Sequence, residues 1–97
     1  MDIPELRNKI DALDAKILAL LTRRAALVLA IGRVKKSRGL AVRDAAREAE
    51  VFARLEAQCS PSLPAAAVRK IFTTILAENR RLEKRVSPPA QGRRTRA

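Results

Sequence analysis

The fold is decided by the stretch from Pro4 to Lys36, which reads PELRNKIDALDAKILALLTRRAALVLAIGRVKK. Its apolar residues recur every three or four positions, which is typical of one face of an α-helix. They are Leu6, Ile10, Leu13, Ile17, Leu20, Leu27, Ile31 and Val34. At 1.5 Å per residue, the pattern predicts a helix about 50 Å long. A domain of 97 residues is narrower than this, so we expect the apolar face to pair with a second chain.

Two shorter helices are predicted downstream, because Ser37-Arg38-Gly39 breaks the periodic pattern. The second helix runs from residue 42 or 43 to residue 58. The third follows a connector rich in Ser and Pro, with Ser62 as a candidate N-cap. It ends before residues 87–89, which read Ser-Pro-Pro. No stretch favours a strand, so the sequence predicts an all-α chain of one long and two shorter helices.

The length of the chain allows a single domain, which we assign to residues 1–86. Residues 87–97 form a basic tail that we expect to be disordered. The net charge is +11, but residues 84–97 hold five cations and no acid, which leaves +6 for residues 1–83. The two Phe residues, with no Tyr or Trp, provide no aromatic platform for stacking bases. We therefore do not expect a nucleic-acid partner.

The residue inventory also limits the chemistry. Cys59 is the one cysteine and there is no histidine, which excludes a disulfide framework, a multi-cysteine metal site and an imidazole base. We expect neither a metal nor a cofactor. The start of the chain lacks the basic and apolar regions of a secretory signal, and the longest apolar stretch, 25–31, is too short to span a bilayer. These features predict a soluble cytoplasmic protein.

Polar residues interrupt the apolar faces of all three predicted helices. Arg24 takes the step between Leu20 and Leu27, and Lys35 lies three turns further along nearly the same face. A buried arginine is costly unless an anion or a hydrogen-bond partner meets it. The corresponding polar residues of the other two helices are Asp44, Glu48, Asn79 and Glu83. Together they predict an anion-binding pocket inside a helical bundle.

Each of these residues also has a structural interpretation. Arg24 can pair with an acid of another helix, and Lys35 can neutralise a helix dipole. Asp44 suits an N-cap, and a buried Asn79 can fix helix register. The run Arg80-Arg81 is most simply a solvated surface.

Four segments of the chain resemble the AroQ-class chorismate mutases. They are LRNKIDALD at 6–14, LLTRR at 20–24, GRVK at 32–35 and VRDAARE at 42–48, and the likeness covers about residues 3–86. The resemblance implies an intertwined helical homodimer with two equivalent active sites. It also implies the rearrangement of chorismate to prephenate in aromatic amino-acid biosynthesis, without a cofactor.

Site residues follow from the resemblance, position by position. Arg7 is similar to an arginine that enters the active site of the neighbouring subunit. Arg24 is similar to the in-chain arginine that holds a substrate carboxylate, and Lys35 to the lysine that contacts a carboxylate and the ether oxygen. Asp44 and Glu48 resemble the pair near the ring hydroxyl of the substrate.

The second half of the implied site departs from the commonest family pattern. Arg47 lies next to Glu48 in the chain and is a candidate to orient it. Asn79 stands where many relatives have Ser, and Glu83 where many have Gln. Arg80 stands where a small apolar residue often lines the pocket. Because an ionised Glu83 would repel the developing charge on the ether oxygen, we expect activity to rise below neutral pH.

The same fold leaves alternatives open. An isochorismate–pyruvate lyase or an aminodeoxychorismate mutase uses the same kind of pocket. A regulatory or binding module that docks on another shikimate-pathway enzyme is a more distant alternative.

Overall fold

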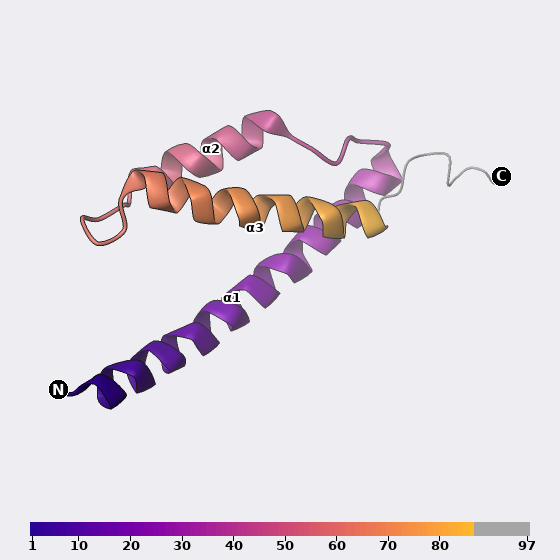
Figure 1. Ribbon diagram of the computed structural model, residues 1–97. Coiled ribbons are helices and arrows are strands. Elements are labelled where there is room, and N and C mark those ends of the chain that lie inside the picture. The colour runs from indigo at the N-terminus through magenta and orange to yellow at the C-terminus, as the bar shows by residue number, and fades with distance from the viewer. Residues whose placement is uncertain (87–97) are drawn as a thin grey trace.

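The computed structural model describes residues 1–86 of the 97-residue chain. These residues form three α-helices: α1 (Ile3–Arg38), α2 (Ala45–Glu56) and α3 (Ala65–Val86). Within this part of the chain there is no β-strand, only an isolated bridge between Ser60 and Leu63. The prediction of one long and two shorter helices is confirmed (Figure 1). The tail at 87–97 lies outside the described residues.

Both ends of α1 are capped by neighbouring residues. The Asp2 side chain accepts a hydrogen bond from the backbone N–H of Glu5 at 2.9 Å, and Pro4 lies in the first turn. Gly39 ends the helix with a φ of 68°, in the left-handed region that favours glycine. Its N–H bonds the carbonyls of Lys35 and Lys36. The helix therefore extends one or two residues beyond each predicted end.

The apolar face of α1 is largely uncovered. The N-terminal half of α1 runs away from α2 and α3 (Figure 1). In this half of α1, the residues of the predicted apolar face are between 46% and 60% exposed. They are Leu6, Ile10, Leu13, Ile17 and Leu20. This confirms the prediction that the chain cannot bury this face by itself. None of the three helices is long and apolar enough to cross a membrane.

The shorter helices form a small layer in which α3 packs against both α1 and α2. The buried apolar side chains within residues 1–86 are Val51, Val68 and Leu76. Three such residues make a small core, as expected for a chain of this length.

The start of each short helix differs from its prediction. α2 begins at Ala45 rather than at residue 42 or 43, because the Asp44 side chain caps it by accepting from the Arg47 N–H at 3.0 Å. The prediction of Ser62 as an N-cap was wrong. Residues 60–63 instead form a tight turn, in which the Ser60 hydroxyl accepts from the Leu63 N–H at 3.1 Å. α3 starts after this turn, at Ala65.

Gly32 sets how closely α3 approaches α1. It is buried, and a Cβ added to it would lie 2.6 Å from Cγ2 of Val86 and 3.4 Å from Cγ of Glu83. Both residues lie in the last turn of α3, where it crosses the C-terminal half of α1 (Figure 1). The absence of a side chain at Gly32 therefore brings Glu83 close to the next turn of α1, which carries Lys35.

We expect Gly32→Val to lower the free energy of unfolding by about 1–3 kcal/mol, because overpacking at the crossing forces α3 outward. Urea unfolding followed by circular dichroism measures this change. The control is Ala26→Val, an exposed position on the same helix, where only the small difference in helix propensity should appear. Equal losses in the two variants would contradict the proposed role of Gly32.

Candidate functional site

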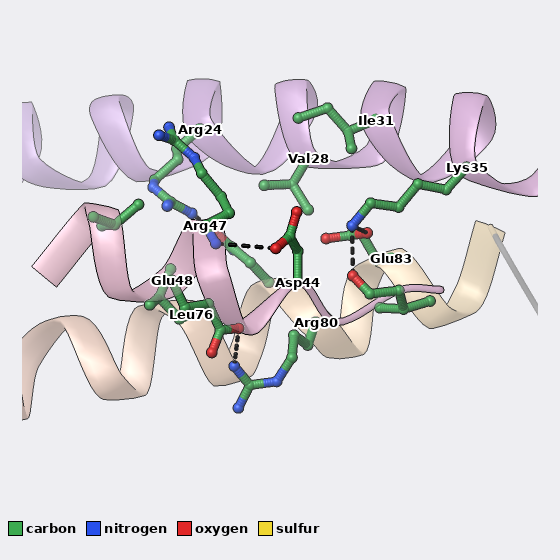
Figure 2. A pocket seen from close by; sticks show the side chains of 13 residues that line it. Arg24, Val28, Ile31, Lys35, Asp44, Arg47, Glu48, Leu76, Arg80 and Glu83 are labelled. Atoms are coloured by element: carbon green, nitrogen blue, oxygen red, sulfur yellow. Dashed lines mark hydrogen bonds and ion pairs between the residues drawn. The ribbon is translucent and has the colours of Figure 1, made fainter. Parts of the chain in front are cut away.

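A pocket of about 240 Å³ lies between the three helices (Figure 2). All three helices contribute polar side chains to it, and the segment before α2 supplies its edge. The lining residues are Arg24, Val28, Ile31, Lys35, Val42, Asp44, Arg47, Glu48, Val51, Leu76, Asn79, Arg80 and Glu83.

The wall provided by α1 places two cations along one face. Arg24 and Lys35 are three turns apart, a rise of about 16 Å. Val28 and Ile31 lie between them and give the wall an apolar centre (Figure 2). The pocket therefore offers a positive group at each end of an apolar strip.

Lys35 forms the most enclosed ion pair of the pocket. Its Nζ donates to Oε2 of Glu83 at 2.9 Å, and the two side chains are only 17% and 10% exposed. It also donates to the backbone carbonyl of Val42, in the segment before α2. Lys35 is thus directed into the pocket by one contact from α3 and one from the loop. In this position its charge is available to a bound anion.

Arg24 is held differently, because its partner is neutral. Its Nη1 donates to the side-chain oxygen of Asn79, on α3. Burial lowers the pKa of the Arg24 guanidinium from its usual value, and the positive charge of Arg47 adds to the effect. None of the ion pairs formed within residues 1–86 includes Arg24. A half-buried cation whose charge is not neutralised nearby is well suited to an anionic ligand.

Glu48 is the best-held acceptor in the pocket. Its Oε2 accepts from Nη1 of Arg80 at 2.6 Å, and its Oε1 lies 3.3 Å from Nη2 of Arg43. The Glu48 side chain is 16% exposed, and Figure 2 shows Arg80 reaching it from α3. Asp44 lies nearby, at the N-terminus of α2.

Six of the seven predicted site residues line this pocket: Arg24, Lys35, Asp44, Glu48, Asn79 and Glu83. Arg7 does not. It lies exposed near the start of α1, about 25 Å along the helix from Arg24. The structure therefore leaves the predicted role of Arg7 in a neighbouring subunit untested.

Three of the interpretations drawn from the sequence need correction. Arg80 is not a solvated surface residue, because it lines the pocket and pairs with Glu48. Arg47 does not pair with Glu48 and instead lies 3.4 Å from the exposed carboxylate of Glu50. Arg24 pairs with no acid of another helix within the described residues, because its partner is an amide.

Two residues were missed by the sequence analysis: Val42, which lines the pocket, and Arg43, which pairs with the pocket residue Glu48. The carbonyl of Val42 carries no side-chain signal, because any residue supplies a carbonyl. Arg43 had a weak signal, since it directly precedes the predicted acid Asp44. Their placement depends on the path of the loop that joins α1 to α2.

The geometry suits a small elongated dianion. Guanidinium groups bind carboxylates through planar pairs of hydrogen bonds, and an ammonium acts as a compact point charge. Such a ligand would place its anionic groups near Arg24 and Lys35 and its apolar part against the α1 wall. A neutral hydroxyl on the ligand would find acceptors at Glu48 and Asp44.

Comparison with known proteins agrees with this geometry. A family model described as chorismate mutase type II matches residues 6–84. A protein named chorismate mutase, from Methanocaldococcus jannaschii, is 28% identical over 92 residues, which cover 94% of this chain and 93% of that protein. The comparison with solved structures gave no match.

Proposed function

The chain belongs to the chorismate mutase type II family, and we propose that it rearranges chorismate to prephenate in the pocket between its three helices. The observation that carries the proposal is the joint placement of Arg24 and Lys35. They stand at opposite ends of one apolar strip in one cavity, which provides one cation for each of the two carboxylates of chorismate.

The reaction suits a pocket of this composition. Chorismate breaks an ether C–O bond and forms a C–C bond within the same molecule, so no nucleophile, proton transfer or cofactor is required. The protein has to hold the enolpyruvyl side chain over the ring, which lowers the entropic part of the barrier. It also has to stabilise the negative charge that grows on the ether oxygen. Fixed cations perform both tasks.

We assign one carboxylate of the substrate to Arg24, whose guanidinium Asn79 holds in place. Lys35 binds the other carboxylate and the ether oxygen. The contacts of Lys35 with Glu83 and with the Val42 carbonyl direct its ammonium into the pocket before the substrate arrives. Such preorganisation is what makes a charge effective in a transition state.

The ring hydroxyl of chorismate is its one neutral donor, since both carboxyls are ionised near neutral pH. The acids that line the pocket are Asp44, Glu48 and Glu83. Glu83 is engaged by Lys35, and one oxygen of Asp44 caps α2. These contacts leave Glu48 best placed to accept from the hydroxyl, with Asp44 beside it.

We further propose that two copies of the chain form an intertwined homodimer through α1. An apolar groove of about 500 Å³ continues its exposed face, lined by Leu27, Ala30, Ile31, Val34, Lys35 and Leu40. Ile31 and Lys35 line both the groove and the pocket, so a partner helix in the groove would lie beside the site. This arrangement would let the partner supply Arg7 to the pocket.

We expect kcat for chorismate to rise about tenfold or more as the pH falls from about 8 to about 5, because Glu83 can donate a hydrogen bond to the ether oxygen of the bound substrate only in its protonated form. Glu83→Gln, whose amide donates at every pH, should flatten the profile.

Initial rates of chorismate consumption across this pH range measure the effect. The matched control is Glu78→Gln, which removes an exposed acid of the same helix and should keep the wild-type profile. A wild-type profile that is flat would contradict the assigned role of Glu83.

The test of the function itself is the identity of the product. Purified protein with chorismate should give prephenate, identified by chromatography. Pyruvate and salicylate formed from isochorismate, with no turnover of chorismate, would move the assignment to an isochorismate–pyruvate lyase.

We place the activity in the cytoplasm. We also expect any shikimate-pathway enzyme that docks on this protein to raise its turnover of chorismate.

A further inference from the structure

Arg80 is a charged residue of the pocket to which the proposed reaction gives no role. It projects from α3 and is 27% exposed in its side chain, whereas its neighbour Arg81 is 78% exposed. The Nη1 atom of Arg80 lies 2.6 Å from Oε2 of Glu48, which is on α2. This contact therefore joins two walls of the pocket.

The pair controls both the direction and the charge of Glu48. Arg80 occupies one carboxylate oxygen and Arg43 approaches the other at 3.3 Å. The Arg43 side chain is 65% exposed, so water and salt screen its charge. The Arg80 side chain is more enclosed than that of Arg43. Its charge therefore acts more strongly on a substrate group that contacts Glu48 in the pocket. The negative charge of Glu48 is thus offset, while its remaining lone pairs can still accept a hydrogen bond.

We propose that Arg80 is a specificity-determining residue, which makes the pocket accept a ring hydroxyl and reject an ammonium group at the same position. This inference rests on the proposed function, in which Glu48 meets the ring hydroxyl of chorismate. A hydroxyl is neutral and hydrogen-bonds an ion-paired carboxylate without penalty. An ammonium would be attracted by Glu48 and Asp44 but repelled by Arg80. The charges of Arg24 and Arg47, which line the same pocket, would add to the repulsion.

Discrimination between two substrates tests this inference. The substrates are chorismate and 4-amino-4-deoxychorismate, in which an amino group replaces the ring hydroxyl. Wild-type protein should prefer chorismate. Arg80→Gln keeps a hydrogen-bond donor near Glu48 but removes the charge, and we expect it to shift the ratio of kcat/KM values about 30-fold toward the amino substrate. Arg80→Ala should shift the ratio in the same direction and also lower kcat/KM for chorismate about tenfold, because Glu48 loses its orientation.

Two control variants distinguish the effect of the Arg80 charge from a general structural effect of replacing an arginine on α3. Arg80→Lys restores a cation near Glu48 and should recover most of the wild-type preference. Arg81→Ala removes the neighbouring arginine, whose partner Glu78 lies 3.8 Å away on the surface, and should leave both kcat/KM values unchanged.

The inference is overturned if the Gln and Ala variants lose activity toward both substrates by the same factor, since a purely structural role predicts that result. It is also overturned if the Lys variant shows the same loss of preference as the Gln variant. A wild-type protein that converts neither substrate overturns the proposed function, and the inference with it.

Discussion

Lys35→Ala is expected to lower kcat for prephenate formation about 10³-fold, because the variant loses the cation that stabilises charge on the ether oxygen. The Lys35 ammonium lies inside the pocket, between Glu83 and the Val42 carbonyl. Since the interaction with the ether oxygen strengthens as the C–O bond breaks, most of the loss should appear in kcat rather than in KM.

The measurement is steady-state kinetics of chorismate consumption, with circular dichroism to verify that the helices form. Lys36→Ala is the matched control. It removes an exposed lysine one position further along α1 and should retain wild-type kinetics. If Lys35→Ala raised KM and left kcat unchanged, Lys35 would contribute to substrate binding only.

Ile17→Glu is expected to convert the proposed dimer to a monomer and to abolish nearly all activity. Ile17 lies on the apolar face of α1 and is 54% exposed in the single chain. A glutamate there would bury a charge in the proposed interface without a partner, which is strongly destabilising. The monomer would also lack the Arg7 that we propose a partner chain supplies.

Sedimentation equilibrium and chorismate turnover, measured on the same samples, test this prediction. The control is Ala15→Glu, which introduces the same charge on the opposite side of the same helix, where the chain is exposed. It should stay dimeric and active. An Ile17→Glu protein that remains dimeric would show that the dimer does not use this face.

Mixing two inactive variants and measuring chorismate turnover tests whether Arg7 acts in the site of the partner chain. Arg7→Ala and Arg24→Ala chains that exchange subunits form hybrid dimers with one intact site each. Random exchange of equal amounts should restore about a quarter of the wild-type activity. If Arg7 acted within its own chain, every site would keep a defect and mixing would restore nothing.

The helices were predictable because their signals are local. The apolar period of α1, Pro4 in its first turn and Gly39 at its end each act within a few residues. The start of α2 was misplaced by two or three residues, although its cap Asp44 had been considered. The prediction placed the helix start on the basis of the apolar pattern rather than of the capping side chain.

The site residues were predictable for a different reason. Polar residues on apolar helix faces are costly, so each one points to a ligand or a specific partner. Arg24 and Asn79 both interrupt such faces, and they hydrogen-bond each other across the pocket. Among residues 1–86 Arg7 makes no contact of this kind, and the role proposed for it depends on a second subunit.

Local sequence patterns predict the three helices, the exposed apolar face and six of the side chains that line the pocket. The packing of the helices decides which of the pocket residues pair with one another. Arg47 neighbours Glu48 in the chain, but consecutive helical residues point in different directions, and Arg47 reaches Glu50 instead. Arg80 is 32 positions away and reaches Glu48, because α3 packs against both α1 and α2. Pairing across helices depends on how closely they pack, which the local pattern of either helix does not contain.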